Sequence, residues 1–140
     1  MTPYNIRRFL GYSALAVIFA VLLTGCALFP SQFDGQEHAR LIDIHMASAD
    51  DSVCRERDTA SRVATKMYQD AGWVWNYGQH LTNNEKMSRM EQELLSMTKE
   101  LHERYQKADP VSQFYCKSKF ENIHRATTTI IKVSARRPRS

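Results

Sequence analysis

Apolar residues recur every three or four positions along most of the chain after residue 51, which is the spacing of one face of an α-helix. The longest stripe follows alternating steps of four and three, as in a coiled-coil seam; it comprises Ala60, Ala64, Met67, Ala71, Val74, Gly78 and Leu81. Two further stripes comprise Met87, Met90, Leu94, Met97, Leu101 and Tyr105, and Cys116, Phe120, Ile123, Thr127 and Ile130. The pattern predicts helices over about 52–81, 84–108 and 110–133.

An earlier segment, residues 36–49, has a less decided pattern. Its centre, from Leu41 to Met46, partly alternates, which fits a short strand. A helix also fits, because apolar residues at helical spacing form a second stripe: Ala39, Ile42, Met46 and Ala49. A lone strand would have no partner, so we expect a helix. Short connections make neighbouring helices antiparallel, and the expected fold is all-α: a small antiparallel bundle of three to four helices.

The first 25 residues differ from the rest in composition. Arg7 and Arg8 occur without any acidic residue, and an apolar run from Phe9 to Leu23 follows. Positive charge before a short apolar run is the layout of a secretory signal peptide. The run is shorter than the roughly 20 residues that a membrane-spanning helix needs. An uncleaved N-terminal anchor is the alternative interpretation.

The run ends in Leu23-Thr24-Gly25-Cys26, which resembles the lipobox of bacterial lipoproteins. The resemblance implies that the Cys26 thiol receives a diacylglyceryl group, that the chain is cut before it, and that the new amine takes an acyl chain such as palmitate. Ala27 stands where Asp often retains lipoproteins at the inner membrane. By the same resemblance the chain is expected on the outer membrane facing the periplasm, or on the plasma membrane of a Gram-positive cell.

The sequence holds three cysteines, an odd count. If Cys26 carries lipid, Cys54 and Cys116 remain, and disulfides persist in the oxidising compartment that an exported chain enters. In an up-and-down topology the starts of the second and fourth helices lie at the same end. We therefore predict a Cys54–Cys116 disulfide. A metal site is the weaker alternative, because neither cysteine belongs to a CxxC motif.

Charge is concentrated near the C-terminus. The chain has 19 Lys and Arg against 15 Asp and Glu, and the formal net charge is +4; loss of Arg7 and Arg8 with the signal peptide lowers it to +2. Four basic residues close the chain and are expected to contact anionic lipid headgroups: Lys132, Arg136, Arg137 and Arg139. Nucleic acid is not an expected partner of an exported protein. The expected organisation is a signal peptide at 1–25, a tether at 26–35, a helical bundle at 36–133 and a disordered basic tail at 134–140.

Residue patterns typical of enzymes are not found. The five histidines form no HxxxH or HExxH motif, and neither GxSxG nor a phosphate-binding glycine loop occurs. We expect neither an enzyme nor a metal or cofactor other than the lipid. A haem or small-ligand carrier stays open as a minor alternative, because Met46 and His124 could face each other across the bundle. Their placement is similar to the Met/His pair of small periplasmic b-type cytochromes.

An aromatic cluster, Trp73, Trp75 and Tyr77, lies near the end of the second predicted helix. It covers neighbouring helices, forms a hot spot for a protein partner, or rests at the lipid interface. The expected function is that of a non-enzymatic accessory or assembly factor that binds an envelope protein. Its general build is similar to that of some secretion pilotins. The alternative is an exclusion or immunity lipoprotein of a phage or plasmid.

Overall fold

The computed structural model describes residues 31–139, so the predictions for the signal peptide and for Cys26 lie outside the described residues. Four α-helices and one short 3-10 helix make up this part of the chain: α2 (Gly35–Ala49), η2 (Asp51–Arg55), α3 (Arg57–Gly78), α4 (Glu85–Gln106) and α5 (Gln113–Ala135). Residues 31–139 contain no strand. The prediction of an all-helical fold is confirmed, and the ambiguous first segment is a helix.

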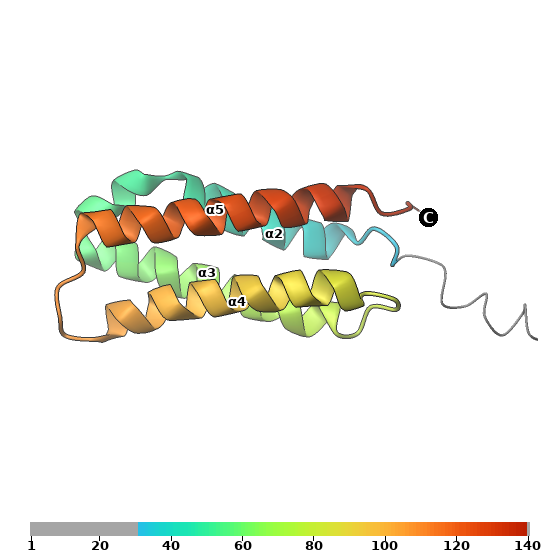
Figure 1. The fold of residues 1–140 in the computed structure, drawn as a ribbon, viewed down its shortest axis with the longest axis horizontal. Helices are drawn as coiled ribbons and strands as arrows, with labels where there is room; N and C mark the ends of the chain where they lie inside the picture. The colour runs from blue at the N-terminus through green and yellow to red at the C-terminus, as the bar shows by residue number, and fades with distance from the viewer. Residues whose placement is uncertain (1–30, 140) are drawn as a thin grey trace, which may run out of the picture. The chain divides into compact units, whose positions relative to one another are not determined.

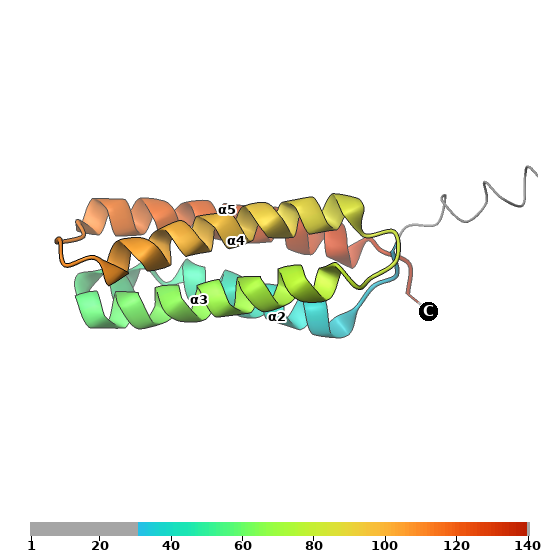
Figure 2. The same cartoon turned by 90° about the horizontal axis from the view of Figure 1, so that it is seen from below.

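The four α-helices run side by side, and successive helices point in opposite directions (Figures 1 and 2). Helix α2 packs against α3 and α5, and α4 packs against the same two helices. The starts of α2 and α4 therefore lie beside the ends of α3 and α5. We call this the tether end, because residues 31–34 lead into α2 there; the opposite end is the disulfide end. No helix within residues 31–139 is long and apolar enough to cross a membrane.

Local capping explains where the helices begin and turn. The Asp34 side chain accepts hydrogen bonds from the N–H groups of Gln36 and Glu37, both at 2.9 Å, and so caps α2. Ser112 caps α5 in the same way. In the turn between α3 and α4, Asn83 has a φ of 56°, a left-handed conformation that asparagine adopts more readily than most residues.

Two helices bury the faces that the sequence predicts. Helix α3 buries its stripe from Ala60 to Gly78, and α5 buries its stripe from Cys116 to Ile130. In α4, Glu91 and Thr98 occupy core positions, while Met90 and Met97 are only half-buried. Both polar residues continue the alternating steps of four and three, so spacing rather than apolar character decides which face of α4 is buried.

Helix α2 does not bury the apolar stripe that was noted in its sequence. It buries Leu41 and Ile44 completely, whereas Ile42 is 40% exposed and Met46 is 66% exposed. This orientation packs Leu41 and Ile44 into the core that α2 shares with α3 and α5. The stripe of Ala39, Ile42, Met46 and Ala49, whose spacing indicated a helix, consequently lies away from the core.

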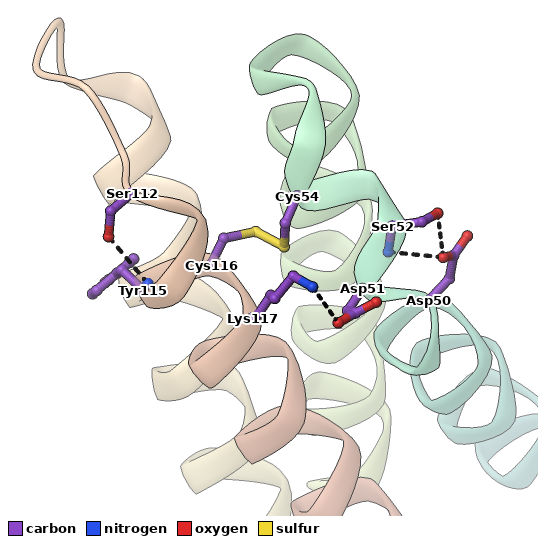
Figure 3. The surroundings of a disulfide bond; sticks show 8 residues. All are labelled: Asp50, Asp51, Ser52, Cys54, Ser112, Tyr115, Cys116 and Lys117. Carbon is purple, nitrogen blue, oxygen red and sulfur yellow. Dashed lines mark hydrogen bonds and ion pairs between the residues drawn. A yellow bond between two sulfur atoms is a disulfide. The ribbon is translucent and has the colours of Figure 1, made fainter.

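The predicted disulfide is confirmed at the disulfide end. Cys54 in η2 is bonded to Cys116 in the first turn of α5; their Cα atoms are 5.8 Å apart, and the two residues are 62 positions apart in the sequence. Figure 3 shows an ion pair beside the bond, between Lys117 of α5 and Asp51 of η2 at 3.0 Å. The bond thus joins η2 to the start of α5 and fixes the ends of two helices that are far apart in the chain.

Candidate functional site

A group of polar side chains lies buried at the tether end, and we call it the buried charge cluster: Ser31, Glu37, Asn84, Glu91 and Arg137. At its centre, Arg137 forms an ion pair with Glu37, and these side chains are 5% and 0% exposed. Arg137 donates a second hydrogen bond to the Asn84 side-chain oxygen. Such charge-assisted contacts are stronger than hydrogen bonds between neutral groups. Arg137 therefore joins the end of α5 to the starts of α2 and α4.

Asn84 connects three further parts of the chain. Its side-chain nitrogen donates to the carbonyl oxygen of Gly78 at 2.9 Å, at the end of α3. Its oxygen accepts a hydrogen bond from the Ser31 hydroxyl at 3.2 Å. One amide side chain thus holds the turn between α3 and α4, the segment that precedes α2, and Arg137.

Glu91 is the unusual member of the cluster. It is fully buried, and neither of its carboxyl oxygens meets a donor among the described residues; the same is true of Glu37 Oε1. Burial first, and then the neighbouring Glu37 carboxyl group, raise the pKa of Glu91 to about 9. Glu91 therefore keeps its proton at neutral pH. Its O–H group can then donate to Glu37, which gives both carboxyl groups a partner.

Gly78 provides the space for this carboxyl group. A Cβ atom at position 78 would lie 2.1 Å from Glu91 Oε2 and 3.0 Å from the Asn84 side-chain nitrogen. Any side chain at this position would displace the Glu91 carboxyl group. The close approach thus requires glycine here, near the end of α3.

The segments on either side of the cluster hold each other, and we call residues 31–34 together with 136–139 the terminal clasp. The Phe33 N–H donates to the Pro138 carbonyl oxygen at 2.9 Å, and the Arg139 guanidinium lies 5.2 Å from the Phe33 ring centroid. The Tyr77 hydroxyl donates to Asp34 at 3.0 Å. Burial works to raise the pKa of Asp34, but the N–H groups of the α2 cap and this hydroxyl outweigh it and hold the pKa below its usual value.

The clasp corrects two expectations from the sequence. The predicted tether reached residue 35, but Ser31 is already buried, and α2 begins at Gly35. A disordered tail was predicted from Ser134, but α5 continues to Ala135, and Arg137 faces the interior rather than a lipid headgroup. The physical reason is Glu37: a carboxylate buried this deeply needs a cation beside it. Lys132, Arg136 and Arg139 are exposed as expected.

The three aromatic residues are placed differently from one another. The Trp73 and Tyr77 rings stack with centroids 4.7 Å apart, and the Arg40 guanidinium of α2 lies 5.6 Å from the Trp73 ring centroid. Trp73 is 36% exposed, whereas Trp75 and Tyr77 are half-buried. Tyr77 is further committed to Asp34. Trp73 is therefore the most exposed member of the cluster.

Histidines form a second polar contact between α2 and α5. The rings of His45 and His124 stack with centroids 4.0 Å apart, and each ring also has a polar neighbour, the Thr127 hydroxyl and the His45 carbonyl oxygen respectively. Burial, followed by the proximity of His124, lowers the pKa of His45. Met46, the other residue considered for haem, is 66% exposed, while His124 contacts His45. Residues 31–139 contain no group of three His, Cys, Asp or Glu side chains suited to a metal ion.

Sequence reasoning missed most of the buried charge cluster. The one available signal was the position of Glu91, which falls on the four-and-three spacing of α4 between Met87 and Leu94. Nothing local marks Glu37 or Ser31 as buried, because their partners are distant in sequence.

No protein-family model matches this chain, and comparisons with curated proteins and with solved structures also find no significant match.

Proposed function

We propose that this chain is a lipid-anchored, non-enzymatic accessory protein of a bacterial envelope. Residues 1–25 serve as the signal peptide, Cys26 carries the lipid, and the four helices form an antiparallel bundle on the periplasmic side of the outer membrane. The bundle binds an envelope protein and supports the assembly or stability of a larger complex.

The observation that carries this proposal is the Cys54–Cys116 disulfide. A structural disulfide is typical of proteins that reach an oxidising compartment. It also leaves Cys26 as the single unpaired cysteine of the chain, at the position that the lipobox resemblance assigns to the lipid. Export and lipid attachment together account for all three cysteines.

Binding rather than catalysis is supported by how the polar side chains are used. The members of the buried charge cluster are engaged with one another and with the ends of the helices. The stacked histidines likewise contact a hydroxyl group and a backbone carbonyl. Trp73 has an exposed face beside Arg40, and tryptophan and arginine are enriched among residues that dominate protein–protein binding. We therefore place the partner contact at the surface shared by α2 and α3.

A photo-crosslinking residue at Asn76, which is exposed and three positions after Trp73, tests this contact in intact cells. We expect one discrete adduct, which Trp73→Ala abolishes because the exposed ring is lost. The matched control is Phe114→Ala, which removes a more exposed aromatic side chain, 84% accessible, at the disulfide end. The control should leave the adduct unchanged. An adduct that survives Trp73→Ala, or no adduct at all, would refute this assignment.

A further inference from the structure

We propose that the tether end docks on anionic lipid headgroups through Lys86, Arg89, Arg136 and Arg139. This inference rests on the proposed anchoring through Cys26. It adds an orientation: the helices stand with the tether end against the membrane and the disulfide end away from it. Two observations carry it, namely the number of residues between Cys26 and the clasp and the distribution of charge between the two ends.

Because of the clasp, few residues lie between Cys26 and the first hydrogen-bonded residue of the described chain. We call residues 31–139 the helical unit. Within it, Ser31, Phe33 and Asp34 are hydrogen-bonded to Asn84, Pro138 and Tyr77 respectively. Only residues 27–30 therefore separate the proposed lipid on Cys26 from Ser31, the first residue that the structure describes. Five residue steps span at most roughly 17 Å when fully extended. This length is much less than that of the tether of residues 26–35 that the sequence predicted.

This short tether limits how the helices can face the membrane. Helix α3 has 22 residues, which corresponds to a length of about 33 Å. The tether is about half as long, so the helical unit cannot stand on its disulfide end while Cys26 stays at the bilayer. The tether end therefore remains close to the headgroups. Whether this contact is attractive depends on the charge of the side chains that the tether end exposes.

The exposed charge at the tether end is mainly positive. Lys86 and Arg89 lie in the first turns of α4, and Arg136 and Arg139 follow α5; all four are exposed. None of them forms an ion pair within residues 31–139. The exposed acid nearby is Glu85. The four cations are therefore available to a negatively charged surface.

The disulfide end differs, because several of its charges are compensated locally, although Arg55 and Lys107 are exposed there without an ion pair among the described residues. Lys117 pairs with Asp51 at 3.0 Å, and Arg104 pairs with Asp109 at 3.9 Å. The Arg57 guanidinium donates hydrogen bonds to the carbonyl oxygens of Lys107 and Asp109, at 2.5 and 2.8 Å. This comparison favours the tether end as the face that meets anionic lipid.

The expected attraction is modest for each residue but sufficient once the protein is anchored. A basic side chain near an anionic leaflet contributes about 1 kcal/mol, and the effect decays within a Debye length of about 8 Å at physiological ionic strength. The lipid keeps the tether end within roughly 17 Å of the bilayer, about two Debye lengths, which makes docking an intramolecular step with a high effective concentration. Arg137 takes no part, because it is buried against Glu37.

The two tryptophans of the chain report on this contact, because both lie in the part of α3 nearer the tether end. The full lipidated protein is reconstituted into vesicles of phosphatidylcholine, alone or mixed with phosphatidylglycerol, that carry a nitroxide on some headgroups. We expect stronger quenching of tryptophan fluorescence on the anionic vesicles. High salt and the variant Arg136→Glu/Arg139→Glu should both abolish the additional quenching.

The matched control is Arg55→Glu/Lys107→Glu, which makes the same charge change at exposed positions of the disulfide end and should keep the additional quenching. Equal quenching on both kinds of vesicle, or equal loss in both variants, would overturn docking while the protein still floats with the vesicles. Failure to float with neutral vesicles would instead overturn the anchoring itself, and docking with it. Melting temperatures of both variants should lie close to that of the parent protein, because all four positions are exposed and Arg139→Glu removes a single ring contact, that with Phe33.

Discussion

Replacing Arg137 with Met should lower the free energy of unfolding by roughly 3–5 kcal/mol, the usual cost of removing one partner from a buried ion pair. Glu37 is fully buried, and Arg137 is the cation that pairs with it. Asn84 would also lose a donor to its side-chain oxygen. Most small domains are stable by only about 5–15 kcal/mol. The substitution therefore removes a large part of the stability, and urea unfolding monitored by circular dichroism measures it.

The neighbouring Arg136 provides the matched control, because it is exposed and forms no ion pair within residues 31–139. Arg136→Met should change the free energy of unfolding by no more than about 0.5 kcal/mol. Adding Glu37→Gln to Arg137→Met should restore most of the loss, since the buried site then holds no unpaired charge. Equal effects of the two single Arg substitutions would show that the buried ion pair does not hold the clasp.

Glu91→Gln should stabilise the protein at neutral pH and flatten its dependence on pH. The pKa of Glu91 rises from 4.5 to about 9 on folding. Its contribution to stability is therefore fully present below pH 4.5, declines between pH 4.5 and 9, and is lost above pH 9. One pKa unit corresponds to about 1.4 kcal/mol, so the contribution already lost by pH 7 is on the order of 3 kcal/mol. Gln avoids this loss, because it stays neutral and its amide can donate to Glu37.

Urea unfolding at pH 5, 7 and 9 provides the measurement. The parent protein and Glu91→Gln should be closest in stability at pH 5 and differ most at pH 9. Glu93→Gln, an exposed change on the same helix, should follow the parent protein throughout. If the curves of the parent and Glu91→Gln run parallel across this range, Glu91 does not hold a proton in the folded state.

The helices that the sequence predicted well are those whose core positions are apolar. In α3 and α5 the apolar residues and the four-and-three spacing coincide, so the buried face could be identified without the structure. In α2 they do not coincide, because Ile42 and Met46 compete with Leu41 and Ile44 for the core. The sequence of one helix does not show which of its two apolar stripes is buried. That depends on how the helix packs against its neighbours, and the other stripe stays exposed.

The disulfide was predictable but the buried charge cluster was not, and the difference has a physical cause. Cysteine pairing follows from redox chemistry, from counting, and from the levels of helix starts, all of which are visible in the sequence. The Glu37–Arg137 pair joins residues 100 positions apart, and both residue types are usually exposed. Only the packing of four helix ends brings them together. The same packing explains why residues 136–139, which were predicted to be part of a disordered tail, belong to the clasp.

The intact mass of the protein extracted from membranes tests most directly whether the helical unit is tethered through lipid on Cys26. We expect a chain that begins at Cys26, carries a diacylglyceryl group and a further acyl chain, and lacks two hydrogens because Cys54 and Cys116 are bonded. Cys26→Ala should yield no lipidated species. An unmodified chain, or one that retains residues 1–25 in the membrane fraction, would contradict the account.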